Sequence, residues 1–164
     1  MFVLLRQLAR VRHDAGLARG RPRSVALRHV DAGSCNGCEH ELGLATSPAY
    51  DLERFGLDIA ASPRHADILL VTGPVTTRMA TALRTAYDAM PEPRLVAALG
   101  DCALGRGILG DPAELVGALD EVLPVDLRIP GCPPTPQTIA EHLLAGLDGG
   151  LTRDPFRIES KEPM

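Results

Sequence analysis

The chain has 164 residues, a hydrophobic content of 45% and a formal net charge of −4. This length and apolar content suit one globular domain that can fold without disulfide bonds. No apolar run approaches the roughly 20 residues of a membrane-spanning helix, so no membrane span is expected. The acidic body, the presence of only five aromatic residues and the lack of a recognised binding motif argue against nucleic acid as a partner.

The first 23 residues differ from the rest because they are strongly basic. Phe2, Leu5 and Leu8 recur near helical spacing, which indicates an amphipathic stretch. The arginines at the start of the chain are Arg6, Arg10, Arg12, Arg19, Arg21, Arg23 and Arg28, against one acid, Asp14. The segment lacks the apolar core and the cleavage site of a signal peptide. We expect residues 1–23 to be a basic amphipathic arm that lies on a membrane subunit or an anionic membrane surface, with a frayed tail as the alternative.

Three strands are predicted in the first half of the chain. Residues 24–30 alternate apolar and polar side chains, as a strand does, and residues 57–61 form a weaker strand. Residues 67–72 are mostly apolar without alternation, which is typical of a strand that is buried on both faces. Gly73 and the proline after it end this strand.

The middle of the chain predicts helix, strand and helix. Apolar residues recur at helical spacing from Val75 to Met90, and the prolines that follow end this helix. Residues 94–99 are a second apolar strand. Asp111 as N-cap and Pro112 at the first helical position predict a helix over residues 111–122.

A short strand over residues 125–129 and a helix over residues 135–147 complete the pattern. The alternation of strands and helices predicts an α/β fold with a mainly parallel sheet and helices on both faces. We expect one domain over residues 24–148, after the arm of residues 1–23 and before a C-terminal tail of residues 149–164.

All four cysteines lie in loops that follow predicted strands: Cys35 and Cys38, then Cys102, then Cys132. Loops at the carboxyl ends of parallel strands share one edge of the sheet, so these thiols are expected to meet. A 4Fe–4S cluster needs four thiolates, and four are present. Glycines flank each loop and let the backbone approach sulfur closely, and Pro133 after Cys132 matches a pairing found in ferredoxin motifs.

Three other uses of four cysteines remain open. Disulfides need an oxidising compartment, and the sequence gives no sign of export. Inert buried thiols belong on periodic strands and helices rather than among glycines and prolines. A structural zinc would use the same thiolates, although zinc sites usually have two close pairs, and here only Cys35 and Cys38 form one.

Other residues near the cysteines carry weaker signals. Gly105, Gly107 and Gly110 match G-x-G-x-x-G, but they begin too late after the strand for a dinucleotide-binding turn, and Asp111 would repel a phosphate. A flexible loop packed over the cysteine site is the preferred interpretation.

Two side chains are candidates for a proton-linked or tuning role. Glu41, with Glu39 and His40 beside it, follows Cys38 and could carry protons that accompany electrons. A first-turn helix residue is the alternative explanation. Arg106 could raise the potential of a cluster or meet a partner's carboxylate, or it could simply be exposed.

Six segments together resemble the 20-kDa-type small subunits shared by respiratory complex I and membrane-bound, energy-converting nickel–iron hydrogenases. The segments are Gly33 to Cys38, Tyr50 to Gly56, Ser62 to Asp67, Met90 to Arg94, Gly100 to Cys102 and Val125 to Pro134. The resemblance implies a flavodoxin-like domain that holds one 4Fe–4S cluster through Cys35, Cys38, Cys102 and Cys132, next to the active site of a large subunit.

The spacing of the first two cysteines separates the two branches of this family. Complex I subunits have two adjacent cysteines at this position, whereas Cys35 and Cys38 form C-x-x-C, which resembles the hydrogenase branch. The implied partners are a nickel–iron large subunit, a ferredoxin-like iron–sulfur subunit and membrane subunits, on the cytoplasmic face of the cell membrane. A complex I-like subunit serving a quinone site is the main alternative, and a zinc scaffold without redox function is a second.

Overall fold

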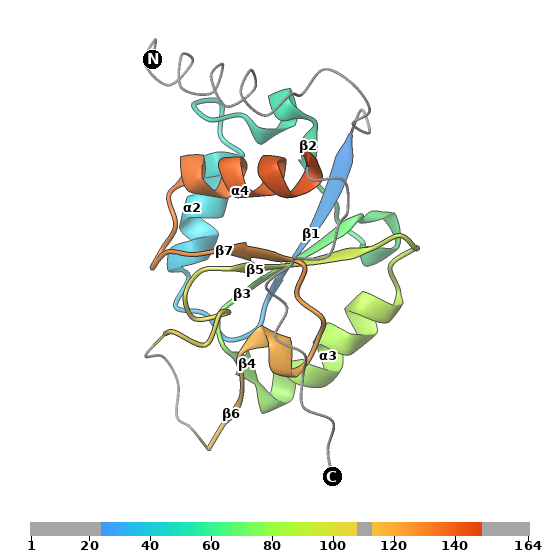
Figure 1. The fold of residues 1–164 in the computed structure, drawn as a ribbon, viewed down its shortest axis with the longest axis vertical. Coiled ribbons are helices and arrows are strands. Elements are labelled where there is room, and N and C mark those ends of the chain that lie inside the picture. Colours follow the sequence, from blue (N-terminus) through green and yellow to red (C-terminus); the bar gives the residue numbers. More distant parts are fainter. Residues whose placement is uncertain (1–23, 108–112, 149–164) are drawn as a thin grey trace.

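The structure, a computed structural model, describes residues 24–107 and 113–148 (Figure 1). The expected arm and C-terminal tail therefore lie outside the described residues, as do Gly110, Asp111 and Pro112. No helix within the described ranges is long and apolar enough to cross a membrane.

A five-stranded parallel sheet forms the centre of the fold. Its strands are β1 (Val25–Asp31), β2 (Leu57–Ile59), β3 (Ile68–Thr72), β5 (Leu95–Leu99) and β7 (Leu127–Ile129). They lie in the order β2-β1-β3-β5-β7, with every neighbouring pair parallel. When only the strands of this sheet are counted along the chain, β5 and β7 become the fourth and fifth strands. The order is then 2-1-3-4-5, which is the flavodoxin-like arrangement. The predicted fold class is confirmed.

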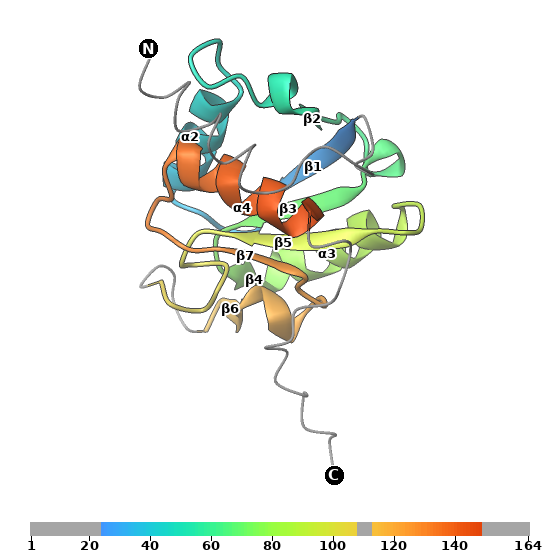
Figure 2. The same cartoon turned by 45° about the horizontal axis from the view of Figure 1, so that its top comes forward.

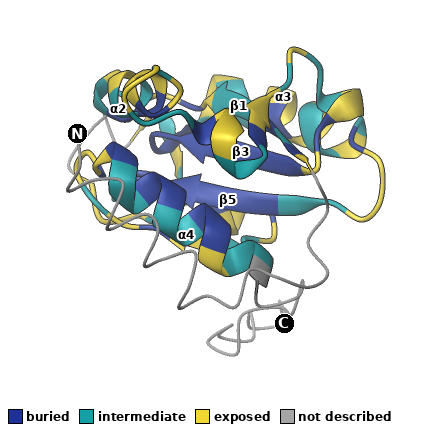
Figure 3. Ribbon diagram, turned by 90° about the horizontal axis from the view of Figure 1, so that it is seen from above, coloured by how far each residue is buried: buried dark blue, intermediate teal, exposed yellow. Residues whose placement is uncertain are grey.

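The strand β3 is fully buried at the middle of the sheet, as its unbroken apolar sequence predicts. Leu70 of this strand is in register with His29 of β1 and with Ala97 of β5. In Figure 3 the neighbouring strand β5 is likewise buried over most of its length.

Helices cover both faces of the sheet (Figures 1 and 2). The helices α2 (Gly37–Ala45) and α4 (Pro136–Asp148) pack on one face, where Leu42 and Leu143 belong to one apolar cluster. The helix α3 (Thr77–Asp88) covers the other face and contributes Leu83 to a second cluster.

Local contacts explain where α4 begins and where α3 ends. Thr135 caps α4, because its side-chain oxygen accepts a hydrogen bond from the Thr138 N–H at 3.2 Å, and proline occupies the first helical position. At the end of α3, Arg94 donates to the Tyr87 carbonyl at 2.8 Å, and its guanidinium lies 4.0 Å from the centre of the Tyr87 ring.

The predicted helix over residues 111–122 is wrong within the described residues. Residues Leu115–Gly117 instead form β6, which pairs antiparallel with β4 (Val75–Thr76), where the sequence had indicated the start of a helix. The 3₁₀ helix η3 (Leu119–Glu121) follows. Gly117 has a φ of 140°, which no helix residue adopts, so the backbone turns there before Leu119 enters the second apolar cluster.

Two short 3₁₀ helices were not predicted. They are η1 (Leu52–Phe55), which is capped by the Asp51 side chain, and η2 (Pro63–His65), which is capped by Ser62. Both lie in the connections before and after β2, and both are too short to show a periodic pattern.

Candidate metal-cluster site

The carboxyl ends of β1, β5 and β7 bring the four cysteines to one edge of the sheet. Cys35 lies in the loop after β1 and Cys38 in the first turn of α2, whereas Cys102 follows β5 and Cys132 follows β7. All four are free thiols, so no disulfide joins them. Cys38 and Cys102 are buried, and Cys35 and Cys132 are exposed. The site therefore has a closed inner side and an open outer side.

The acidities of the thiols show that they act on one another. The pKa of Cys38 is raised to about 12, chiefly by burial and then by the negative charge of Glu39. Charge on Cys102, Cys35 and Cys132 raises it as well. The pKa of Cys102 is raised first by burial and then by Cys132 and Cys35. Thiolate charge on Cys38 or Cys102 is therefore unfavourable in the empty site, and either protonation of the thiols or a bound metal ion or cluster relieves the repulsion.

Glycines make room around two of the sulfurs. A β-carbon on Gly100 would lie 2.5 Å from Cys38 Sγ, and one on Gly107 would overlap Cys102 Sγ. A β-carbon on Gly37 would lie 3.5 Å from Cys35 Sγ, an ordinary contact distance, so a side chain fits there. Gly100 also has a φ of 89°, which side chains rarely adopt. The backbone thus approaches the sulfurs as a bound iron–sulfur cluster requires, and the residues present fit such a cluster.

A single metal ion fits this site less well. No group of three His, Cys, Asp or Glu residues within the described ranges is arranged to hold one ion. A structural zinc needs its sulfurs about 2.3 Å from one point. A four-iron cluster takes each cysteine on a different iron, so its thiols need not converge so tightly.

The loop before Cys35 is shaped by Asp31. Its Oδ1 accepts hydrogen bonds from the N–H groups of Gly33 at 2.8 Å and Ser34 at 2.7 Å. Burial alone would raise the pKa of Asp31, but these hydrogen bonds outweigh it and hold the pKa below its usual range. Asn36, with a φ of 66°, then turns the chain into α2. Asp31 was not singled out from the sequence, although an acid two residues before a Gly-Ser pair is typical of such a turn.

A polar network joins α2 to the sheet next to Cys38. The hydroxyl of Thr72 donates to Glu39 Oε1, and Thr72 Oγ1 lies 2.9 Å from His29 Nε2. His29 Nε2 also lies 3.6 Å from Glu39 Oε1. The other oxygen, Glu39 Oε2, is buried without a hydrogen-bond partner among the described residues. Burial chiefly lowers the pKa of His29, although Glu39 acts in the opposite direction.

The structure thus places Glu39 rather than Glu41 in contact with the sheet. Glu41 lies half-buried on α2, and His40 is exposed. His29 and Thr72 were not singled out from the sequence. A signal did exist, because both occupy the face of their strands that otherwise carries Leu27, Ile68 and Leu70 of the first apolar cluster.

Arg106 is exposed, and its N–H donates to the Asp101 carbonyl at 2.8 Å. The G-x-G-x-x-G pattern has a different use from dinucleotide binding, since Gly107 lies against Cys102 Sγ. The described residues that follow the loop form β6 and not a helix. The rejection of a dinucleotide site agrees with this geometry.

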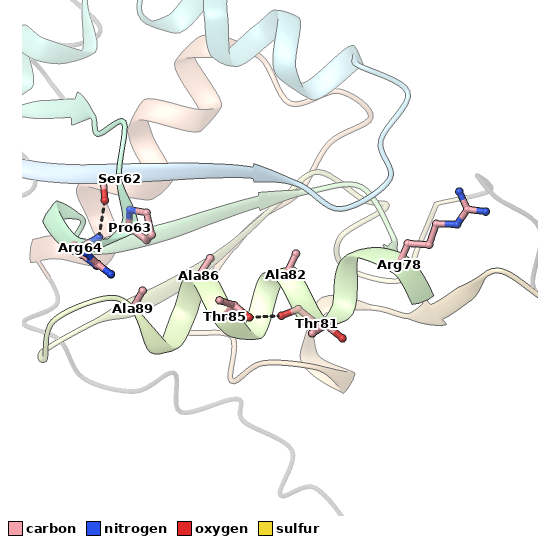
Figure 4. Close-up of a pocket in the computed structure, with 9 residues that line it drawn as sticks. All are labelled: Ser62, Pro63, Arg64, Arg78, Thr81, Ala82, Thr85, Ala86 and Ala89. Atoms are coloured by element: carbon pink, nitrogen blue, oxygen red, sulfur yellow. Dashed lines mark hydrogen bonds between the residues drawn. The ribbon is translucent and has the colours of Figure 1, made fainter.

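A groove of about 670 Å³ lies elsewhere, between η2 and α3 (Figure 4). Small side chains such as Ala82 and Ala86 line it, and Arg64 and Arg78 lie toward its opposite ends. Thr85 donates to the Thr81 carbonyl of its own helix at 2.9 Å. None of the four cysteines lines this groove, so the thiol site remains the candidate functional centre.

Comparison with known proteins identifies the class. The family described as NADH ubiquinone oxidoreductase, 20 Kd subunit, matches residues 35–146, a span that contains all four cysteines, the whole of α3 and most of α4. The chain therefore belongs to this family.

Two similar proteins are hydrogenase subunits. The chain is 44% identical over 126 residues to a probable membrane-bound hydrogenase subunit of Pyrococcus furiosus, covering 77% of this chain and 75% of that protein. It is 45% identical over 122 residues to formate hydrogenlyase subunit 7 of Escherichia coli, covering 74% of this chain and 48% of that protein. An uncharacterized protein of Methanocaldococcus jannaschii is 42% identical over 142 residues, which are 87% of this chain and 95% of that protein.

Solved structures agree with the fold. A chain of the membrane-bound sulfane sulfur reductase, an archaeal respiratory membrane complex, superposes with a TM-score of 0.66 at 32% identity, covering 79% of this chain and 73% of that one. A chain of an NAD+-reducing [NiFe]-hydrogenase gives 0.58 at 22% identity, covering 76% and 93%, and shows the fold alone. The predicted resemblance to the small subunits of membrane-bound hydrogenases and complex I is confirmed.

Proposed function

We propose that this chain is the electron-transfer subunit of a membrane-bound nickel–iron hydrogenase complex. It binds one 4Fe–4S cluster through Cys35, Cys38, Cys102 and Cys132, and this cluster is the one proximal to the active site of a separate large subunit. The observation that supports the proposal is the gathering of four free thiols at one sheet edge, with glycine backbone against the sulfurs of Cys38 and Cys102.

A bound cluster supplies the ability to accept and release one electron at a time. The protein supplies the surroundings. Cys38 and Cys102 lie on the buried side, where bulk water is excluded, and Cys35 and Cys132 lie on the exposed side. A redox partner can therefore approach from the outer side without any change in the fold.

The nickel centre belongs to another subunit in this proposal. The chain has four cysteines, and the cluster uses all of them. Electrons pass between the large subunit, this cluster and a ferredoxin-like iron–sulfur subunit. The complex lies on the cytoplasmic face of the cell membrane, and residues 1–23 dock this chain to membrane subunits. The membrane-bound hydrogenase relative and the formate hydrogenlyase relative support these partners.

A complex I-like subunit that serves a quinone site is the second candidate. The family's own description favours it. The C-x-x-C spacing of Cys35 and Cys38 favours the hydrogenase branch, and so do the two hydrogenase relatives. The similarity to a sulfane sulfur reductase complex fits an electron-transfer subunit equally well, because the substrate is then set by the large subunit.

The test is hydrogen-dependent reduction of a viologen dye by the complex, purified anaerobically with its membrane. We expect the wild-type complex to contain nickel and reduce the dye, and the isolated chain to show no hydrogen turnover. A Cys132→Ala complex should keep its nickel but lose dye reduction, whereas the control Thr85→Ala, on the exposed face of α3, should retain it. A complex without nickel that reduces quinone would establish the second candidate instead.

A further inference from the structure

The loops that carry Cys102 and Cys132 are joined through one residue. The Asp101 N–H donates to the Gly131 carbonyl at 2.9 Å, and Asp101 Oδ1 accepts from the Gly131 N–H at 3.0 Å. The two hydrogen bonds close a ring between the residue before Cys102 and the residue before Cys132. Gly100 extends this pairing, since its N–H donates to the Ile129 carbonyl at 2.8 Å.

The same residue also holds the segment that covers Cys102. The Asp101 carbonyl accepts a hydrogen bond from the Arg106 N–H at 2.8 Å. The next residue, Gly107, lies against Cys102 Sγ. Three polar groups of Asp101 therefore join its own turn to two other segments of the cluster site, the Cys132 loop and the segment over Cys102.

The Asp101 side chain also brings a negative charge to this position. The residue is only partly exposed, so solvent screens its charge incompletely. The charge lies beside two of the proposed ligands, because Asp101 directly precedes Cys102 and its Oδ1 is held against the N–H of Gly131, the residue before Cys132. A fixed negative charge opposes the addition of an electron nearby.

We propose that Asp101 is a positioning residue that sets the Cys132 loop against the Cys102 loop and that its negative charge keeps the reduction potential of the bound cluster low. This inference rests on the proposed function, since it requires the cluster. It assigns two separable effects to one side chain: a hydrogen-bond acceptor for Gly131 and a charge beside Cys102.

Two substitutions separate these effects. Asp101→Asn keeps a carbonyl oxygen for the Gly131 N–H and removes the charge. Asp101→Ala removes both and leaves that N–H without its partner. A matched control is Asp88→Asn, which removes one negative charge from the exposed end of α3.

The experiment measures iron content, the low-temperature electron paramagnetic resonance spectrum and the reduction potential of the cluster in the anaerobically purified complex. In Asp101→Asn we expect wild-type iron content. The equilibrium constant for one-electron reduction of the cluster should rise about three- to tenfold, which corresponds to a reduction potential higher by roughly 30–60 mV. In Asp101→Ala we expect lost iron or an altered spectrum. Asp88→Asn should match wild type in all three measurements.

Several outcomes contradict the inference. An Asp101→Asn potential equal to that of Asp88→Asn overturns the charge effect. Full iron and an unchanged spectrum in Asp101→Ala overturn the positioning role, as does iron loss in Asp101→Asn equal to that in Asp101→Ala. If the wild-type complex itself lacks the cluster at these four thiols, the proposed function fails instead, and the two failures are distinguished by that one sample.

Discussion

At the scale of single residues, the site depends on positions where no side chain fits. Gly100 combines a positive φ with a β-carbon position only 2.5 Å from Cys38 Sγ. Gly43, in the same region of sequence as Cys38, has nothing within 4 Å of its β-carbon position and lies on the exposed face of α2. The two glycines therefore form a matched pair for substitution.

We expect Gly100→Ala to lower the stability of the chain by at least about 1–2 kcal/mol, the cost of a positive φ, and to displace Cys38 so that iron is lost. Gly43→Ala should keep its iron and gain about 0.5–1 kcal/mol, because alanine favours a helix. Thermal unfolding and iron analysis of the two variants check this. Equal iron in both would show that the close approach to sulfur is not needed.

His29 leads to a pH prediction with a definite sign. Burial lowers its pKa below the usual 6.5, although Glu39 and Asp31 raise it, and Arg28 adds to the lowering. The unfolded chain then binds a proton more readily than the folded one, so this contribution to stability is present above pH 6.5 and is lost as the pH falls through the folded pKa.

Denaturant unfolding of the chain between pH 5 and pH 7.5 measures this effect. Stability should fall more steeply with acid in the wild type than in His29→Gln, which cannot take up the proton. Parallel curves for the two proteins would contradict the assignment of this pH dependence to His29.

The gathering of the four cysteines could be predicted from the sequence, because each cysteine lies in a short loop with glycine near it. The sequence did not predict the contact between Thr72 and Glu39, because that contact joins the end of a strand to a helix 33 positions away in sequence. Glu41 was preferred over Glu39 and His40, but all three directly follow Cys38, and position in the sequence does not tell which side chain meets the sheet.

At the scale of elements, long periodic segments were predicted well and short ones poorly. The buried strand β3, the helix α3 and the capped helix α4 follow from hydropathy and capping residues. The segment that forms β6 looked helical because the sequence after Asp111 has good capping residues. Pairing with β4 overrides that preference, and such a tertiary contact leaves no local signal.

Gly117→Ala distinguishes the two structures of this segment. In a helix the substitution would stabilise by about 1 kcal/mol. In the described ribbon, a φ of 140° and the nearby Glu121 carboxylate make alanine unfavourable, so we expect a loss of about 1–2 kcal/mol or more. Chemical denaturation measures whether the free energy of unfolding rises or falls. A gain in stability would contradict the β6 structure and favour the helix predicted from the sequence.

At the scale of the whole molecule, the flavodoxin-like strand order explains how distant cysteines meet. The strands that precede them occupy three positions of one parallel sheet, so their carboxyl ends share an edge. This part could be predicted from sequence, because the alternation of strands and helices leaves few topologies. The role of residues 1–23 stays a prediction, since they lie outside the described residues.

Deletion of residues 1–23 should release the soluble part of the complex from the membrane and leave its iron content unchanged. The basic side chains of this arm each contribute roughly 1 kcal/mol near an anionic surface, and the four cysteines lie beyond it. Membrane fractionation with iron analysis tests this. A truncated complex that stays membrane-bound with full activity would show that the arm is only a tail.

The central claim is that four cysteines of this chain hold one 4Fe–4S cluster. It is tested most directly by iron, sulfide and electron paramagnetic resonance analysis of the full chain, reconstituted anaerobically, beside Cys102→Ala and the control Gly43→Ala. We predict about four iron and four sulfide per chain for wild type and control, and a lost or converted cluster in Cys102→Ala. Full iron with an unchanged spectrum in Cys102→Ala, or zinc in place of iron in the wild type, would contradict the claim.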